Sequence, residues 1–394
     1  MDGTRRGFLK VAIGGLVGTA LPGLVFGGRS GGGSGERKPN IIYVMIDDAG
    51  YGDFGGFGSK EVLTPVMERV CGEGTKFTDH YSGSCVCAPT RCVLMTGLHT
   101  GHCRRRDNGS KANREDYPPR GLVPLAKGDV TVAQVLKDGG YVTGGIGKWG
   151  LGNPGTGAEP EKKGFDYWYG YLDQVHAHDH YTDHIWEAGK DIPVPEHAGG
   201  KKGAYLHDLF EAKTFDFVRR HESEPFFLYL AYTLPHGAYV IGHDDPAYQP
   251  YKDKPWAQQV RNYAAMITRV DRTVGKLLEL LKELGLDDDT IVFYTSDNGP
   301  NTPFLKDLNS AGGLRGIKRR LYEGGIRAAM AVRWPGRVPA GRVSDFVWDM
   351  RDVFPTACEI AGVKAPKGLD GISVLPTLLG KEQAAHEHLY WEFH

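Results

Sequence analysis

One stretch of the sequence combines the start of a predicted helix with the side chains of Cys87 and Arg91: Ser84-Cys85-Val86-Cys87-Ala88-Pro89-Thr90-Arg91-Cys92-Val93-Leu94-Met95-Thr96-Gly97. Pro89 has a fixed backbone dihedral and no N–H group, which suits the first turn of a helix and predicts a helix that begins near Cys87. The amino end of a helix carries partial positive charge and free N–H groups, so it favours a bound anion. Arg91 lies one helical turn after Cys87 and can reach the same point. Taken alone, a cysteine in this place is more often a buried structural residue.

The order Cys-x-Pro-Thr-Arg, followed by an apolar pair and Thr-Gly, resembles the signature of the type I, arylsulfatase-like sulfatases. In that family the cysteine is oxidised after translation to formylglycine (3-oxoalanine), the catalytic aldehyde. The resemblance implies that Cys87 is the oxidised residue and that Arg91 is a catalytic residue beside it. Pro89 matches the family, and Thr90 stands where serine is commoner.

Composition and charge are those of an ordinary globular protein. The chain has 394 residues, of which 40% are apolar and 24% charged, and this length suits one large α/β domain or two modest ones. The formal net charge of −1 argues against a nucleic-acid partner. The six cysteines lack the paired Cys-x-x-Cys spacing of structural zinc sites, and we predict no disulfide framework.

The amino-terminal residues predict export. Arg5-Arg6 precedes an apolar stretch from Val11 to Phe26, which resembles a bacterial twin-arginine signal over residues 1–27 and implies the twin-arginine export machinery as a partner. The expected location is therefore periplasmic or extracellular. The stretch contains no clean Ala-x-Ala cleavage site, so anchoring by an uncleaved signal stays open. Residues 28–38 form a Gly/Ser-rich linker, and residues 39–394 form the catalytic domain.

Apolar runs and helical periodicity alternate along the rest of the chain, which favours a mostly parallel sheet flanked by helices. The predicted strands are 41–46, 141–146, 226–231, 290–295 and 328–333, and the main helices are 64–72, 131–137, 205–220, 262–284 and 352–362. The sulfatase resemblance implies an alkaline-phosphatase-like α/β sandwich. Similar proteins continue past the position of His394 with a small antiparallel subdomain, so we expect most of that subdomain to be missing here and the catalytic domain to be truncated.

Two polar pairs follow predicted strands directly. Asp47-Asp48 comes after strand 41–46, and Asp297-Asn298 comes after strand 290–295. The carboxyl ends of strands are the usual place for a site in an open α/β sheet, and adjacent buried carboxylates need a cation nearby. The resemblance implies that these four residues, with the oxidised Cys87, bind the metal. An all-oxygen ligand set favours Ca²⁺, with Mg²⁺ as the alternative.

Three further residues match the family's sulfate-binding positions: Lys148, His236 and Lys318. The resemblance implies that His236 also acts as a catalytic residue that can protonate the leaving alcohol. One position departs from the family, because Gly150 stands where a histidine usually contacts formylglycine or the sulfate. The histidines that could replace it, which the sequence does not rank, are His99, His102, His176, His178 and His180.

The segment from Gln174 to His184 is rich in histidine. Histidines spaced by two on an extended chain would face one side and could bind zinc or copper. A polar loop that lines the substrate pocket is the favoured interpretation. The segment resembles one found in bacterial sulfatases of sulfated polysaccharides, which suggests sugar recognition.

These residues together predict a hydrolase of a sulfate monoester, of a carbohydrate or also of aryl sulfates, in which hydrated formylglycine attacks sulfur and later eliminates sulfate. The implied partners are a sulfated small molecule or oligosaccharide and a formylglycine-generating maturation enzyme. Two alternatives stay open: a phosphodiesterase or phosphonate hydrolase of the same superfamily, and a non-catalytic sulfoglycan-binding homologue.

Overall fold

The computed structural model describes residues 37–108 and 123–393. The predicted signal segment 1–27 and most of the predicted linker 28–38 lie outside the described residues. The first strand of the described residues starts at Asn40.

A mixed sheet forms the centre of the described chain, and the strand order across it is β11-β2-β10-β9-β1-β8-β4-β5-β6-β7. The strands in chain order are β1 (Asn40–Ile46), β2 (Thr75–Phe77), β4 (Val142–Lys148), β5 (Tyr167–Tyr171), β6 (His184–Glu187), β7 (Lys190–Pro193), β8 (Phe226–Ala231), β9 (Thr290–Ser296), β10 (Met330–Arg333) and β11 (Arg342–Ser344). The short strands β3 (His80–Tyr81) and β12 (Trp348–Asp349) pair separately with each other.

The five central strands β9, β1, β8, β4 and β5 are parallel to one another. Strand β10 pairs antiparallel with β9, and β6 pairs antiparallel with β5. The prediction of a mostly parallel sheet is confirmed. The parallel arrangement brings the carboxyl ends of β9, β1, β8 and β4 to one edge, side by side, which is where the candidate site lies.

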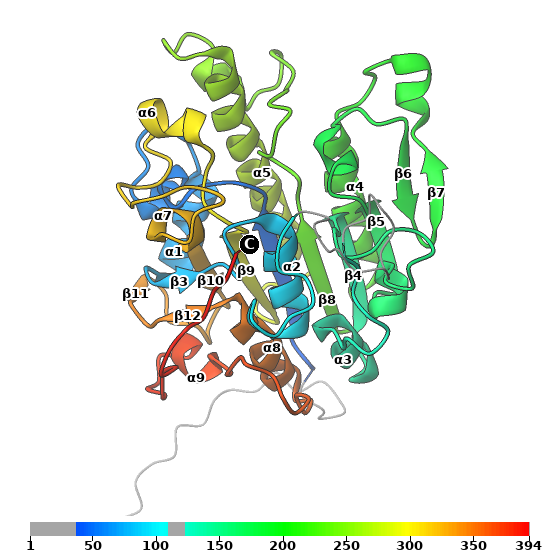
Figure 1. Cartoon of the computed structure of the whole chain (residues 1–394), viewed down its shortest axis with the longest axis vertical. Helices are drawn as coiled ribbons and strands as arrows, with labels where there is room; N and C mark the ends of the chain where they lie inside the picture. Colours follow the sequence, from blue (N-terminus) through cyan, green and yellow to red (C-terminus); the bar gives the residue numbers. More distant parts are fainter. Residues whose placement is uncertain (1–36, 109–122, 394) are drawn as a thin grey trace, which may run out of the picture. The chain divides into compact units, whose positions relative to one another are not determined.

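Helices cover both faces of this sheet (Figure 1). One face packs against α1 (Pro65–Glu73), α4 (Leu206–Arg220) and α5 (Gln258–Glu283), and the other against α2 (Cys87–Thr96), α3 (Val132–Asp138) and α8 (Val353–Ala361). Strand β1 shows why both faces need cover. Its residues Ile42, Val44 and Ile46 belong to one core, and Ile41 and Tyr43 belong to the other. The shorter helices are α6 (Leu305–Leu308), α7 (Glu323–Ile326) and α9 (Leu375–Leu378).

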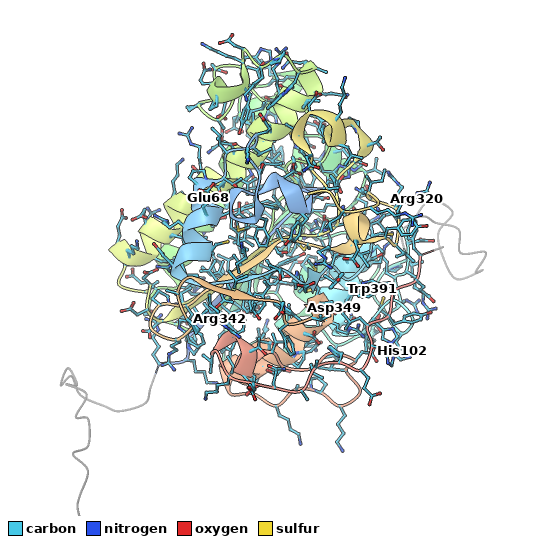
Figure 2. The ribbon with its side chains drawn as sticks, turned by 90° about the vertical axis from the view of Figure 1, so that its left-hand side faces the viewer. Glu68, His102, Arg320, Arg342, Asp349 and Trp391 are labelled. Carbon is cyan, nitrogen blue, oxygen red and sulfur yellow. The ribbon has the colours of Figure 1, made fainter. Side chains whose placement is uncertain are left out.

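The carboxyl-terminal segment follows the outside of the domain and contacts the loops around α2. Trp391 Nε1 donates to the carbonyl of Ser82 at 2.8 Å, and the backbone N–H of Glu392 donates to Thr100 Oγ1 at 2.8 Å. Figure 2 shows Trp391 and His102 on this side of the molecule. The segment therefore packs against both flanks of the helix that carries Cys87.

Within the described ranges, none of the helices is both long and apolar enough to cross a membrane. All six cysteines are free thiols, in agreement with the predicted absence of a disulfide framework.

Candidate active site

The two predicted polar pairs meet at the carboxyl ends of β1 and β9. The strands pair in register up to Ile46 and Ser296, so Asp47-Asp48 and Asp297-Asn298 leave the sheet at the same level. The backbone N–H of Asp48 donates to Asp297 Oδ1 at 3.0 Å. Asp48 has a φ of 71°, a left-handed conformation that few non-glycine residues adopt and that is enriched at functional sites. This turn directs the Asp48 carboxylate back over the ends of the strands.

Helix α2 places Cys87 and Arg91 over these carboxylates. Cys87 is the first residue of the helix, as the position of Pro89 predicted, and both side chains are fully buried. Arg91 donates from one terminal nitrogen to Asp47 Oδ2 (3.2 Å) and to Asp297 Oδ2 (3.1 Å). Its other terminal nitrogen donates to the carbonyl of Lys148 at 2.7 Å. One guanidinium therefore fixes the ends of three strands relative to the helix.

Two lysines complete the charged cluster. Lys148, the last residue of β4, donates from Nζ to Asp47 Oδ2 at 2.7 Å and lies 3.4 Å from Cys87 Sγ. Lys318 Nζ donates to Asp48 Oδ1 at 2.5 Å. The backbone N–H of Lys318 also donates to the carbonyl of Pro300, which ties its loop to the segment after β9. Three cations thus face three carboxylates in a site closed to solvent.

Burial and these neighbours shift the pKa values of the carboxylates in different directions. Burial alone would raise the pKa of Asp47, but Lys148, His236 and Arg91 hold it well below its usual range. Burial, together with the adjacent charge of Asp47, raises the pKa of Asp297 to about 7, against the opposing effect of Arg91. Arg91 and the two lysines therefore stabilise the carboxylates unevenly, and a further cation beside Asp297 would favour its charged form.

The oxygen atoms present fit a hard divalent cation. Asp47 Oδ1 and Asn298 Oδ1 are buried oxygens without a hydrogen-bond partner among the described residues. One ligand atom each from Asp47, Cys87 and Asp297 lies within 4.8 Å of the others, and the same holds for Asp47, Asp48 and His236. Unpaired buried oxygens beside other carboxylates are what an ion with oxygen ligands would satisfy.

The surroundings of Cys87 also fit an oxygen atom in place of its sulfur. Asn108 Nδ2 donates toward Sγ at 3.2 Å, and the ammonium of Lys148 points at the same atom. The side-chain oxygen Oδ1 of Asn108 accepts from the backbone N–H of Ala88 at 3.0 Å, which fixes the orientation of the side-chain amide. Because a thiol is a weak acceptor, two nitrogen donors directed at it suit an oxygen better.

His236 follows β8 and faces the Asp48 side of the cluster. Its Nε2 lies 3.4 Å from Asp48 Oδ2 and 3.1 Å from Lys318 Nζ. The ring of His178 stacks on it at 4.2 Å. Burial lowers the pKa of His236, and it lowers that of His178 to about 4, so both rings are neutral near pH 7. The structure thus brings every predicted site residue into one cluster: Asp47, Asp48, Cys87, Arg91, Lys148, His236, Asp297, Asn298 and Lys318.

Of the five candidate replacements for the histidine expected at Gly150, His178 reaches the cluster by stacking on His236, and the other four make different contacts. His99 and His102 pair with Asp370 beyond the far end of α2, and His180 contacts the carbonyl of His236. His176 contacts Thr182 Oγ1. None of the five hydrogen-bonds to Cys87 within the described part of the chain, whereas Gln174 does: Cys87 Sγ donates to Gln174 Oε1 at 3.4 Å. Sequence reasoning missed Gln174 and Asn108 as site residues, and the glycine at position 150 was a signal that pointed to Gln174.

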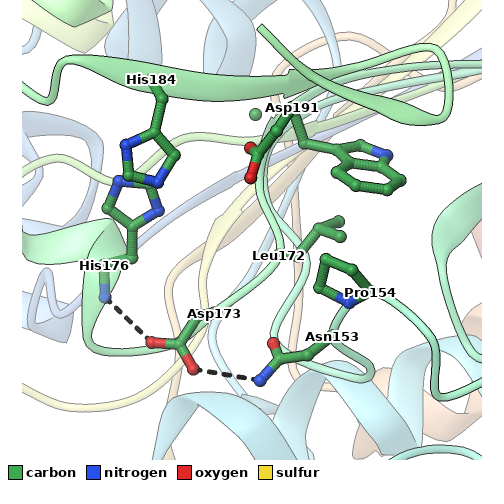
Figure 3. Close-up of a pocket in the computed structure, with 9 residues that line it drawn as sticks. Asn153, Pro154, Leu172, Asp173, His176, His184 and Asp191 are labelled. Carbon is green, nitrogen blue, oxygen red and sulfur yellow. Dashed lines mark hydrogen bonds between the residues drawn. The ribbon is translucent and has the colours of Figure 1, made fainter. Parts of the chain in front are cut away.

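The histidine-rich segment does not form the extended ladder that a zinc or copper site would need. His176–His178 is a short helical turn, and His176 stacks on His184 at 4.4 Å. Among the described residues, no close group of potential metal ligands includes a member of this run. The segment lines a cavity of about 310 Å³ instead, shown in Figure 3, whose walls are Asn153, Pro154, Gly170, Leu172, Asp173, His176, His184, Trp186 and Asp191.

Comparison with known proteins gives a consistent result. The sulfatase family model matches residues 39–363. The N-acetylgalactosamine-6-sulfatase of Canis lupus familiaris is 31% identical over 382 residues, a match that covers 90% of this chain and 69% of the relative. The chain spans about two thirds of the length of such relatives, since the human protein of the same name, 32% identical, is covered to 66% and covers 87% of this chain.

Solved structures agree with this match. Ps i-CgsB in complex with k-i-k-neocarrahexaose has a TM-score of 0.73 and 29% identity, covering 87% of this chain and 77% of that one. A Bacteroides thetaiotaomicron protein from glycosaminoglycan metabolism, BT33336S-sulf, has a TM-score of 0.74 and 26% identity, covering 89% and 84%. A phosphonate monoester hydrolase of Agrobacterium radiobacter, 19% identical with a TM-score of 0.66 over 90% of this chain and 80% of that one, shares the fold. The predicted alkaline-phosphatase-like architecture is thereby confirmed.

Proposed function

This chain belongs to the sulfatase family, a family of sulfuric ester hydrolases, and we propose that it cleaves a sulfate monoester of a carbohydrate at the cluster around Cys87. The observation that carries the proposal is the burial of Cys87 between donors directed at its Sγ and the carboxylates of Asp47 and Asp297. An ordinary structural cysteine has no need of such surroundings. A nucleophile that takes up and releases an anion does.

Oxidation of Cys87 by a maturation enzyme is part of this proposal. The aldehyde would supply, once hydrated, an oxygen nucleophile and a way to release sulfate without attack by water. Arg91 and Lys148 are preorganised around residue 87, because hydrogen bonds to Asp47 fix both side chains before any substrate binds. Preorganised donors of this kind stabilise charge that develops in the transition state.

Asp47, Asp48, Asp297 and Asn298 would hold a divalent cation, Ca²⁺ in preference to Mg²⁺, which would supply Lewis-acid charge next to residue 87. Without it, the charges of Arg91, Lys148 and Lys318 offset those of the three carboxylates. With it, the site carries a net positive charge and favours an anionic ester.

Lys318 and His236 face the reacting group from the Asp48 side. Lys318 can donate to a sulfuryl oxygen, and His236 Nε2, which lies next to that ammonium, can pass a proton to the leaving alcohol. The two residues therefore form one hydrogen-bonded pair, separate from the pair Arg91 and Lys148.

Two observations support a carbohydrate substrate: the named relatives and the cavity that the histidine-rich segment lines. The relatives include an N-acetylgalactosamine-6-sulfatase and a structure in complex with a neocarrahexaose. The cavity near the histidine-rich segment offers the indole of Trp186, two carboxylates and an amide (Figure 3), groups that suit a sugar ring with its hydroxyls. Export through the twin-arginine machinery, with a periplasmic or extracellular location, is proposed from Arg5-Arg6 and the apolar stretch that follows this pair.

The test compares 4-nitrophenyl sulfate with a 4-nitrophenyl phosphodiester, using protein produced together with a formylglycine-generating enzyme. We expect mass spectrometry to show the aldehyde at residue 87, and the sulfate ester to be the better substrate by kcat/KM. The Cys87→Ala variant should lose the activity. A preference for the phosphodiester, or full activity in Cys87→Ala, would reject the proposal. A panel of sulfated mono- and oligosaccharides then identifies the linkage.

A further inference from the structure

The space beside Gly150 is already filled by another side chain. A Cβ atom on Gly150 would lie 2.3 Å from Gln174 Nε2, and the φ of Gly150 is +72°, which side chains rarely adopt. A histidine at position 150 and a glutamine at position 174 would therefore compete for the same volume. Gln174 can occupy this space because residue 150 is a glycine.

Gln174 reaches the reactive position through this space. Its Oε1 accepts from Cys87 Sγ at 3.4 Å, and Asn108 Nδ2 contacts the same sulfur at 3.2 Å. Gln174 is only 6% exposed. Its Nε2 is buried and has no partner among the described residues, although an unpaired buried amide N–H is costly. The unpaired N–H of Gln174 Nε2 next to Cys87 therefore indicates a ligand that would accept its hydrogen bond.

The backbone around Gln174 is tied to the strand that carries Lys148. The N–H of Trp149 donates to the carbonyl of Tyr171 at 2.8 Å, and the N–H of Gly150 donates to that of Leu172 at 3.1 Å. Asp173 then fixes the turn, because its carboxylate accepts from the N–H of His176 at 3.0 Å and from Asn153 (Figure 3). Gln174 is thus presented by a rigid turn and not by a free loop.

We propose that Gln174 takes the place of the missing histidine and is a positioning residue of this sulfatase: Oε1 accepts a hydrogen bond from residue 87, and Nε2 donates to an anionic oxygen of the bound sulfate group. The inference rests on the proposed function. A carboxamide donates and accepts hydrogen bonds but does not take up a proton near neutral pH, so Gln174 orients groups and performs no proton transfer. The ammonium groups of Lys148 and Lys318 remain to balance the charge of the sulfate group.

The experiment uses Gln174→Ala and the nearly isosteric Gln174→Glu, with Gln134→Ala as the matched control, because Gln134 is exposed on α3. Binding of inorganic sulfate is measured by calorimetry in the Cys87→Ala background, and steady-state kinetics with 4-nitrophenyl sulfate are measured in the matured protein. We expect Gln174→Ala to weaken sulfate binding and to lower kcat by about tenfold each, the effect of one charge-assisted hydrogen bond.

Gln174→Glu keeps the acceptor and loses the donor, so we expect a larger loss of sulfate affinity than in Gln174→Ala, with aldehyde content at residue 87 unchanged. Gln134→Ala should match the parent. Sulfate affinity and kcat within about twofold of the parent in both Gln174 variants would overturn the inference. Loss of the aldehyde in Gln174→Ala would overturn it as well, since Gln174 would then serve maturation. If the parent itself does not hydrolyse the sulfate ester, the proposed function fails first, and the sulfate-binding measurement in the Cys87→Ala background still decides the role of Gln174.

Discussion

At the scale of single residues, His236 contacts two charged groups of the site at once. Its Nε2 contacts both Asp48 and Lys318, and under the proposed function the same atom passes a proton to the leaving alcohol. The ring is neutral near pH 7 because burial lowers its pKa. A proton delivered to the substrate would be drawn from this hydrogen-bonded pair.

The first prediction separates these roles by leaving group. We expect His236→Ala to lower kcat/KM for a carbohydrate sulfate by about 10² to 10⁴, the range of a lost general acid. The loss for 4-nitrophenyl sulfate should be smaller, because a nitrophenolate leaves without protonation. Steady-state kinetics on the two substrates measure the difference, and His243→Ala, at an exposed histidine, is the control. Equal losses on both substrates would exclude the acid role.

His80 shows the effect of a buried histidine outside the site. Its ring packs edge to face against Trp348, with centroids 4.5 Å apart, and burial lowers the pKa of His80 to about 3. The unfolded chain binds a proton at this histidine near pH 6.5, whereas the folded chain does not. The stability contributed by neutral His80 is therefore complete above pH 6.5 and is lost as the pH falls from 6.5 toward 3.

The second prediction concerns this loss of stability at low pH. His80 should reduce the free energy of unfolding by about 2 kcal/mol between pH 7 and pH 5, and His80→Phe should remove this part of the pH dependence. Urea unfolding at both pH values measures it, with the exposed His243→Ala as the control. An unchanged slope in His80→Phe would contradict the assignment.

At the scale of elements, α1 is held at its amino end by a residue from α5. Asp271 accepts from the backbone N–H groups of Val66 (2.8 Å) and Met67 (2.9 Å) and is fully buried. Helix α1 has no side-chain cap of its own, since Thr64 makes no capping hydrogen bond. The backbone N–H groups of Val66 and Met67 in its first turn are therefore hydrogen-bonded by a residue of another helix.

The third prediction is that Asp271→Ala lowers the free energy of unfolding by about 2–4 kcal/mol, because two buried N–H groups lose their acceptor. Asp271→Asn keeps one carbonyl acceptor and should lose less. The midpoints of denaturant unfolding give the stability differences, provided that the dependence of the unfolding free energy on denaturant concentration is the same in all variants. The control is Asp216→Ala, at an exposed position of α4, which should leave the stability close to that of the parent. Equal effects of Asp271→Ala and Asp216→Ala would refute the capping role.

Elements with long apolar patterns were predicted well from the sequence. Strand 226–231 coincides with β8, and the predicted helix 205–220 differs from α4 by one residue. The short elements β6, β7 and α6 were not predicted, because four residues carry too little periodicity to separate strand, helix and turn. The histidine run was expected to be extended as one alternative, yet part of it forms a helical turn that Asp173 stabilises.

At the scale of the whole molecule, the candidate cation site joins segments about 250 residues apart. Asp48 and Asn298, at the ends of β1 and β9, already hydrogen-bond to each other at 2.8 Å. An ion that binds there binds only the folded chain, so it stabilises the fold by mass action.

The fourth prediction is that Ca²⁺ raises the melting temperature, equivalent to about 2.7 kcal/mol at a hundredfold excess over its Kd. Chelation should reverse the shift, and Mg²⁺ should act more weakly. Thermal unfolding in matched ionic strength measures it, with Asp48→Asn as the variant that should respond less. A melting temperature indifferent to both ions would speak against the site.

The sequence by itself identified the candidate site residues and the strand or helix end that presents each of them: carboxylates after two apolar runs, a cysteine before a proline, and an arginine one turn later. These are local properties, set by spacing along one segment. Only the tertiary structure decided that Gln174 and not a histidine contacts Cys87. The physical reason is that the distance between residues 87 positions apart depends on the order of β8, β4 and β5 in the sheet and on the volume left beside Gly150, and neither is encoded in a local pattern.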